Sequence, residues 1–338
     1  MDKNKNRKIS DFFRKREVLT CCILIAIWLI ISLFNKNYFT TNNFCVILRT
    51  LSYYGIIVAG LSLVIIQGDR DMSTGGSCGF SAVLGTAIMY TTNCFGMQGT
   101  DQEWLGILLT VLIMMVIGAC IGAFIGFTVV TLNLPAFIAT TAARYILQGC
   151  IMIVCGGSYI YPLPDKFVEF GKAGIPIGKS VISVHFLIAL FLLILILGIL
   201  MRKTKWGRSV YQTGSNRISA ELAGIKTAKV RYISYMILHA LCALSGMCNA
   251  AYLKKGDPNI GRDWELTCVA ACVIGGVKMS GGVGNATGLI IGLLTFFSIN
   301  SAIAYLGLNT FLQDVVVGVV LLVIMISDSV TSRQKIRA

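Results

Sequence analysis

The sequence has few of the residues that catalysis and metal binding need. Only two of its 338 residues are histidines. His185 and His239 lie within or beside apolar runs, so we expect them to be hydrogen-bonded packing residues. A zinc-dependent membrane hydrolase requires clustered ligands, and two scattered histidines argue against one. The twelve cysteines include no pair with Cys-x-x-Cys spacing. Most lie in apolar runs, where they act as small hydrophobic residues.

Charged residues are also scarce, at 13% of the chain, whereas a soluble domain of this size carries about a quarter. Hydrophobic residues make up 56% and the mean hydropathy is +0.77. The apolar residues cluster in runs of about twenty, which is long enough to cross a bilayer core as a helix. The sequence therefore predicts an all-α, polytopic membrane protein.

Nucleotide-binding motifs are missing too. The segment 174–180 is one residue short of a phosphate-binding loop, and 282–288 lacks the spacing of a dinucleotide site. The net charge of +14 follows the segments between apolar runs and forms no interleaved aromatic surface, so no nucleic-acid partner is expected. We expect the chain to bind no cofactor.

The apolar runs predict about ten transmembrane helices, and basic residues set their direction. Positive charges keep a loop on the cytoplasmic side. They gather in the tail 1–17, the loop 202–231 and the tail 328–338. Both termini are thus predicted to be cytoplasmic, flanking a transmembrane domain over 18–327. The expected spans are 18–34, 48–67, 73–92, 104–130, 135–155, 181–201, 232–253, 265–279, 283–304 and 310–327.

The loop 202–231 carries eight basic residues and a single acid, Glu221. Within it, Ser215 or Asn216 is suited to cap a short helix and Gly224 to end it. Ile218, Leu222 and Ile225 would share one face of that helix. Such a surface helix either holds a soluble partner protein or lies on the lipid headgroups.

Two glycine-interrupted segments resemble each other. Gly68–Gly76 and Gly275–Gly282 each place glycines around a Met-Ser pair inside an apolar run. Paired interruptions in two halves of a chain indicate discontinuous helices around a central pathway. In the first segment, Asp71 or Ser73 is suited to cap a half-helix whose amides face a cavity. Amides, hydroxyls and a carboxylate there would suit a sugar or an ion.

Charges inside apolar runs are costly and indicate functional sites. The deepest is Arg144, about 13 Å along its expected helix at the usual rise. It should pair with an acid, for which Asp71 is the candidate. Either a structural ion pair or direct ligand contact would explain it. The other charges in such positions are Asp69, Arg70, Glu265, Lys278 and Asp314.

Taken together, these segments resemble the ribose-type family of ABC sugar-importer permeases over roughly residues 45–325. The matching segments are 68–75, 137–140, 207–208, 214–216, 223–225, 265–266, 269–271, 274–276, 280–284, Asn300 and Gly318. The chain departs from the family pattern at Asp69 and Arg70, at Ala136 in place of a proline, and at Gln148 in place of an arginine. Arg144, one turn earlier, is placed to substitute for that arginine.

The resemblance implies a permease subunit that moves a sugar or similar small polar solute inward by alternating access. It is not an enzyme in itself, because ATP is bound and hydrolysed by a cytoplasmic ABC ATPase. The other implied partners are an extracytoplasmic solute-binding protein and a second permease subunit, either identical or homologous. The implied location is the bacterial plasma (inner) membrane. An ion-coupled secondary transporter, with Asp71 and Asp314 as carriers, is the alternative.

These expectations assign two sets of residues. The predicted substrate pathway consists of Asp71, Ser73, Arg144, Gln148, Glu265 and Asn300. The residues predicted to couple the chain to the ATPase are Gly214, Asn216, Glu221, Gly224 and Ile225.

Overall fold

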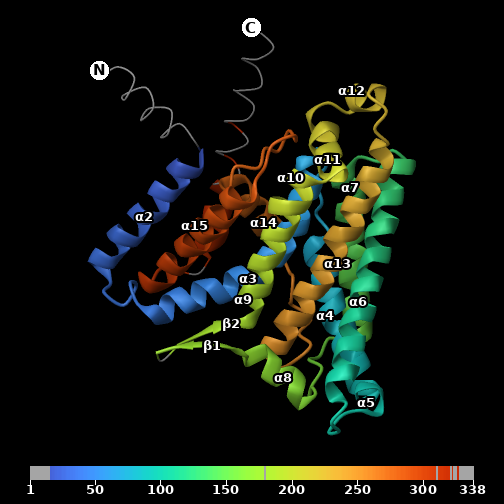
Figure 1. Ribbon diagram of the computed structural model, residues 1–338. Helices are drawn as coiled ribbons and strands as arrows, with labels where there is room; N and C mark the ends of the chain where they lie inside the picture. Colours follow the sequence, from blue (N-terminus) through green and yellow to red (C-terminus); the bar gives the residue numbers. More distant parts are fainter. Residues whose placement is uncertain (1–15, 179, 310, 320–321, 323–325, 327–338) are drawn as a thin grey trace.

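The computed structural model describes residues 16–178, 180–309, 311–319, 322 and 326. This part of the chain is almost entirely helical (Figure 1). The first elements are α2 (Arg16–Phe34), α3 (Thr41–Ile66), α4 (Thr74–Thr91), α5 (Asn93–Gly96), α6 (Glu103–Gly126), the π-helix η1 (Phe127–Thr131), α7 (Ala136–Cys155) and α8 (Asp165–Lys172). They are followed by β1 (Gly174–Ile177), β2 (Ser180–Ser183), α9 (Val184–Leu193), the π-helix η2 (Ile194–Leu200), α10 (Met201–Lys203), α11 (Lys205–Ser215), α12 (Arg217–Leu222), α13 (Thr227–Leu253), α14 (Trp264–Ile274) and α15 (Ala286–Tyr305).

Six helical stretches in the described residues are long and apolar enough to cross a membrane. They are 41–66, 103–131, 136–155, 184–203, 227–253 and 286–305, and each corresponds to a predicted span. The predicted spans at 18–34, 73–92 and 265–279 also form helices, namely α2, α4 and α14, although α14 has only 11 residues. Helical structure continues over 312–319. The total of ten spans stays a prediction, because the tails and much of 310–327 lie outside the described residues.

The helices form two flanks. α2 packs beside α15 on one side, and α6 packs beside α13 on the other, with α3 and α4 between them (Figure 1). α3 is the most enclosed span, and from Ile56 to Ile66 its apolar side chains are almost completely buried. α6 and α7 bury far less of their surface, as expected for helices that face lipid.

A ladder of small residues joins α6 to α13. Gly118, Gly122 and Gly126 recur every four residues along α6. A Cβ at Gly118 or Gly122 would collide with a backbone carbonyl of α13, that of His239 or Tyr235. Hydrophobic burial does not drive helix association within lipid, so such close backbone approach supplies the packing energy. These glycines therefore set the α6–α13 distance.

The two resembling segments both interrupt helices in the structure. At the end of α3, Gly68 N–H donates to Ile65 O and Asp69 N–H to Val64 O. At the end of α14, Gly276 N–H donates to Val273 O and Val277 N–H to Cys272 O. The φ angles of the two glycines are +92° and +86°, so both helices end in the same Schellman motif. The structure therefore makes Gly68 equivalent to Gly276. Aligning the two Met-Ser pairs in the sequence would instead pair Gly68 with Gly275, one residue earlier.

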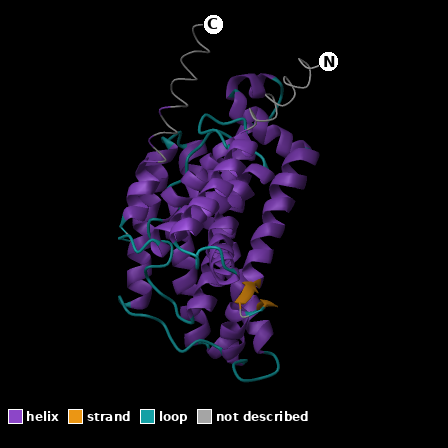
Figure 2. Cartoon of the chain, turned by 90° about the vertical axis from the view of Figure 1, so that its left-hand side faces the viewer, coloured by secondary structure: helices purple, strands orange, loops and turns teal. Residues whose placement is uncertain are grey.

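The segment 156–180, expected to be a loop, has structure of its own, and its second strand extends into the expected span at 181–201. It contains α8 and an antiparallel pair in which Gly174 faces Ser183 and Ile177 faces Ser180. The strands lie towards the end of the molecule opposite α12 (Figures 1 and 2). The sequence did not predict them, because strands of four residues carry no usable periodicity.

We predict that Gly122→Ile separates α6 from α13 and lowers the free energy of unfolding by about 3 kcal/mol, because a β-branched side chain cannot fit against the Tyr235 carbonyl. Thermal unfolding of the detergent-purified protein measures the effect. Gly149→Ile on α7 is the matched control, because no atom lies within 4 Å of a Cβ there. Equal stability of the two variants would show that the glycine ladder does not set the helix packing.

Candidate functional site

Asp71 lies in the unwound segment between α3 and α4 and is fully buried. One carboxylate oxygen accepts hydrogen bonds from the backbone N–H and the hydroxyl of Ser73, both at 2.6 Å. The other lies 3.1 Å from Nε2 of His239 on α13, whose Nδ1 lies 2.7 Å from Ser77 Oγ on α4. A neutral imidazole protonated at Nε2 satisfies both contacts, donating to Asp71 and accepting from Ser77.

This network fixes the start of α4 against the middle of α13. Ser73 is the N-cap residue of α4, but its side chain makes no capping bond. The predicted capping is therefore not observed for either residue, because Asp71 binds the amide of the cap residue itself and not an amide in the first turn of α4. A serine, a histidine and an aspartate in contact resemble the side chains used in hydrolysis. All three side chains are 0% exposed, so in this structure the network is closed to solvent and joins α4 to α13.

The two interruptions meet each other directly. Gly282 N–H, in the second interruption, donates to Ile66 O at the end of α3 at 2.7 Å. Gly214 at the end of α11 lies against both, because a Cβ there would collide with Ile66 O and lie 2.8 Å from Gly282 N. Tyr211, one turn earlier on α11, donates to Gly284 O at 2.7 Å. Burial raises the pKa of this phenol, which keeps it a neutral donor.

Arg144 pairs with two acids at the start of α14. Its guanidinium lies 2.6 Å from Asp263 and also contacts the buried carboxylate of Glu265. The predicted partner, Asp71, was wrong, because Asp71 is held by His239 and Ser73. Arg144 and Glu265, both predicted pathway residues, are thus brought together. Sequence alone could not choose among the acids, because the choice depends on how α7 packs beside α4 and α14.

Gln148 lies one turn beyond Arg144 and lines the same small cavity, which also includes Gly75 and Gly76. Its volume is about 10 Å³, which is room for a single water molecule and no solute. Asn300 does not line this cavity. It lies on α15, where its neighbours Ser298 and Ser301 contact Trp28, Tyr38 and Asn43. The structure therefore divides the predicted pathway residues among separate places.

Asp69 forms a site that the sequence did not predict. Arg231 on α13 binds its carboxylate through two hydrogen bonds, of 2.7 and 2.9 Å, and both side chains are buried. Arg217, the first residue of α12, adds a weaker contact at 3.4 Å and is 42% exposed. Asp69 therefore contacts the basic segment 202–231, not a pathway. That segment carries eight basic residues and one acid. This excess of positive charge was the sequence signal for a carboxylate partner elsewhere in the chain.

The helix predicted within 202–231 is present as α12. Asn216 caps it by accepting a hydrogen bond from Ser219 N–H at 3.0 Å, and Gly224 follows its end with φ +83°. Glu221 accepts from Thr227 Oγ1 and so ties α12 to α13. Ile225 packs against the core, while Ile218 and Leu222 are 72% and 85% exposed. α11, just before it, was not predicted.

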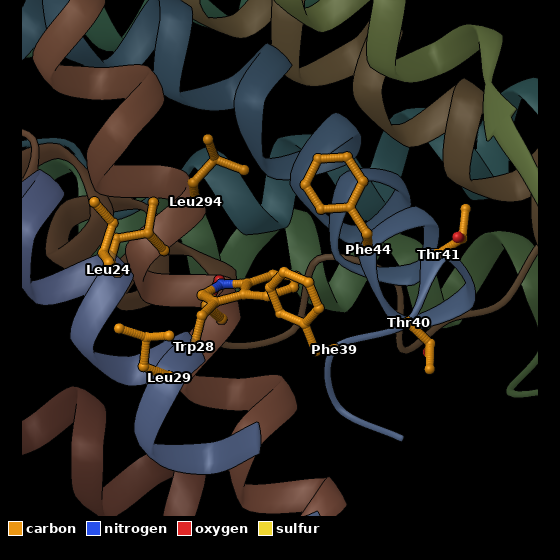
Figure 3. A pocket seen from close by; sticks show the side chains of 10 residues that line it. Leu24, Trp28, Leu29, Phe39, Thr40, Thr41, Phe44 and Leu294 are labelled. Carbon is orange, nitrogen blue, oxygen red and sulfur yellow. The ribbon is translucent and has the colours of Figure 1, made fainter. Parts of the chain in front are cut away.

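A wide apolar cavity opens between α2, the start of α3 and α15 (Figure 3). Its volume is about 680 Å³. Leu24, Trp28, Phe39 and Phe44 line it, and the Trp28 indole donates to Ser298 Oγ. The walls are mostly apolar, with Thr40 and Thr41 at the start of α3, and suit a lipid chain better than a polar solute.

The described residues include no group of three side chains that could hold a metal ion. What the site contains is a set of interrupted helices, paired charges inside the helical bundle, and a short surface helix tied to the interruptions. These features define a multi-pass membrane protein built for solute passage.

Comparison with known proteins supports the same class of protein. Residues 43–325 match the family model described as "Branched-chain amino acid transport system / permease component". The chain belongs to this family. It is the membrane permease subunit of an ABC importer and not an enzyme; in these systems the ATPase is a separate subunit.

Several curated relatives extend over most of the chain. The ribose import permease protein RbsC of Escherichia coli (strain K12) is 30% identical over 93% of both chains. The galactose/methyl galactoside import permease protein MglC of Haemophilus influenzae is 28% identical over 99% of both. The autoinducer 2 import system permease protein LsrC of Yersinia enterocolitica is 28% identical, over 93% of this chain and 82% of its own length. No solved structure matches the chain.

We predict that Arg144→Gln destabilises the protein by about 3–5 kcal/mol, because it leaves the Glu265 carboxylate buried without a cation. Adding Glu265→Gln should restore a large part of the loss, which a double-mutant cycle on thermal unfolding measures. Arg262→Gln is the control, because that arginine contacts Asp263 at 3.8 Å with both side chains mostly exposed. A double variant no more stable than Arg144→Gln would contradict the pairing.

Proposed function

We propose that this permease imports a sugar, with the α12 end of the molecule in the cytoplasm of a bacterium and the α8 end facing outward across the inner membrane. The orientation is supported by the charges at the α12 end, where Arg202, Lys203, Lys205 and Arg208 accompany α10 and α11. The substrate class is supported by the relatives, two of which are named for ribose and galactose import.

α12 is the proposed docking site of a cytoplasmic ABC ATPase, which binds and hydrolyses the ATP. The observation that carries this proposal is the exposure of Leu222 and Ile218 on a helix whose other contacts lead into the bundle. Exposed aliphatic side chains on a capped helix at an aqueous surface are typical of a protein interface. The same pair could rest on lipid headgroups, and binding of the ATPase distinguishes the two.

Two connections carry movement from α12 into the bundle. Arg217 at the start of α12 contacts Asp69, two residues before Asp71, which holds the start of α4. Gly214, two residues before Asn216, touches the backbone where the interruptions meet. Displacement of α12 by the ATPase would therefore act on both interrupted segments. In this proposal, alternating access results because the state of the nucleotide site on the partner is coupled to the state of the pathway in this chain.

The further proposed partners are a solute-binding protein at the outward end and a second permease subunit, identical or homologous. An ion-coupled transporter gains no support from the geometry of Asp71. A carrier carboxylate must exchange its ion with water, whereas Asp71 is sealed by His239 and Ser73. The importer is therefore the function we propose.

We predict that the chain co-purifies with its partner ABC ATPase, and that ligand-loaded binding protein stimulates ATP hydrolysis in the reconstituted complex. Leu222→Asp should weaken ATPase binding at least about tenfold, because it places a charge at the centre of the interface. Leu308→Asp, which alters another exposed leucine beyond the end of α15, should leave binding intact. Uptake by vesicles that contain this chain alone, driven by an ion gradient, would overturn the importer.

We predict that Arg217→Gln leaves the ATPase bound but reduces its stimulation by loaded binding protein several-fold, because α12 loses its contact with Asp69. Lys229→Gln removes a positive charge from the same end without touching Asp69, and stimulation should persist. ATPase rates with and without binding protein supply both readouts. Equal stimulation in the two variants would show that the Arg217–Asp69 contact does not transmit movement.

A further inference from the structure

A second cavity lies between α3, α13 and α14, at the opposite end of α13 from α12. Its volume is about 360 Å³, near the lower limit of small-molecule sites, which run from roughly 300 to 1,000 Å³. Five of its lining residues lie in the first half of α3 and three near the end of α13, and Trp264 opens α14. None of the residues predicted from the sequence lines it. In the proposed orientation it faces outward.

Two polar side chains in the wall of the cavity have no hydrogen-bond partner among the described residues. Tyr53 on α3 is 4% exposed, and its hydroxyl is buried and unpaired. Asn249 on α13 is 7% exposed; no bond of its amide is found in the same part of the chain, and its amide atoms, unlike the Tyr53 hydroxyl, are not fully enclosed. A buried polar group without a partner costs about 1–3 kcal/mol. Each group can be satisfied by a ligand that brings hydroxyl groups.

An aromatic surface forms another part of the wall. The rings of Tyr54 and Trp264 lie with centroids 4.6 Å apart at 34°. Tyr252 lies on the α13 side, and Arg49 extends over its ring at 5.0 Å while donating to its hydroxyl at 2.9 Å. Broad aromatic faces beside hydrogen-bonding groups suit a flat ring that has apolar C–H faces and a polar rim.

The carboxylate of the cavity is already engaged, whereas Arg49 has no acidic partner among the described residues and contacts only Tyr252. Asp257 accepts from Asn259 and forms an ion pair of 3.0 Å with Lys255. No free carboxylate is left for the ammonium group of an amino acid or for a metal cation. An amino acid would find a cation for its carboxylate at Arg49 but no carboxylate for its ammonium group, whereas a neutral polyol requires neither.

Building on the proposed function, we infer that this cavity is a binding site for a neutral monocyclic sugar. The sugar ring packs against Trp264, while its hydroxyl groups bond Tyr53 and Asn249. The site would receive the sugar at the outward end, before it passes the interrupted helices. Its chemistry is that of a monosaccharide, and its volume leaves no room for a long oligosaccharide.

The test is binding of D-ribose, D-galactose and L-leucine to the detergent-purified permease by ligand-observed NMR. We expect saturable binding of at least one sugar that L-leucine does not displace. Tyr53→Phe should weaken it about five- to tenfold, the effect of one hydrogen bond. Trp264→Ala should weaken it further.

Tyr235→Phe is the matched control, because Tyr235 is also buried with an unpaired hydroxyl but lies outside the cavity; sugar binding should be unchanged. The inference is overturned if no sugar binds, if L-leucine displaces it, or if Tyr53→Phe binds as tightly as the unaltered protein. ATPase stimulation by loaded binding protein is measured separately on the unaltered complex. If stimulation fails, the importer proposal fails; if stimulation holds and sugar binding does not, only the cavity assignment fails.

Discussion

The hydrogen bond from Gly282 N–H to Ile66 O joins the two interruptions of the helical bundle. Where a membrane helix is broken, amides and carbonyls lose their partners in a region with little water, and each unpaired group costs several kcal/mol. Here each interruption supplies part of what the other lacks. Schellman bonds satisfy further carbonyls at both helix ends. The discontinuous helices are thus stable only as a pair.

The same constraint governs the charges. Each buried carboxylate near the interruptions has a cation or donor from a distant helix: Asp69 has Arg231, Asp71 has His239, and Glu265 has Arg144. Buried pairs of this kind are weak evidence for stability, since their desolvation offsets much of their attraction. They do specify which helices lie together, because any other arrangement leaves a charge alone. The charges in the apolar runs therefore help to fix the packing around the interrupted segments.

Much of the helical architecture could be predicted from the sequence, because hydrophobic length and basic loops are local properties. Ala136–Cys155 forms almost the whole expected span at 135–155, and Asn216 caps the expected surface helix. The partners of Arg144 and Asp69 could not be predicted, because a charge alone does not say which helix will face it. The sugar cavity was missed for a similar reason: Tyr53 and Asn249 are 196 positions apart and share a wall only after folding.

Gly214 connects the α11–α12 end of the molecule to the interrupted helices through main-chain atoms alone. It meets Ile66 and Gly282 backbone against backbone, with no side chain between them. Side chains absorb small displacements by changing rotamer, whereas a main chain held by hydrogen bonds has no such freedom. The contact is therefore a rigid one between three stretches of main chain. A displacement of α11 therefore meets the main chain of both interrupted segments directly, with no side chain between them to absorb it.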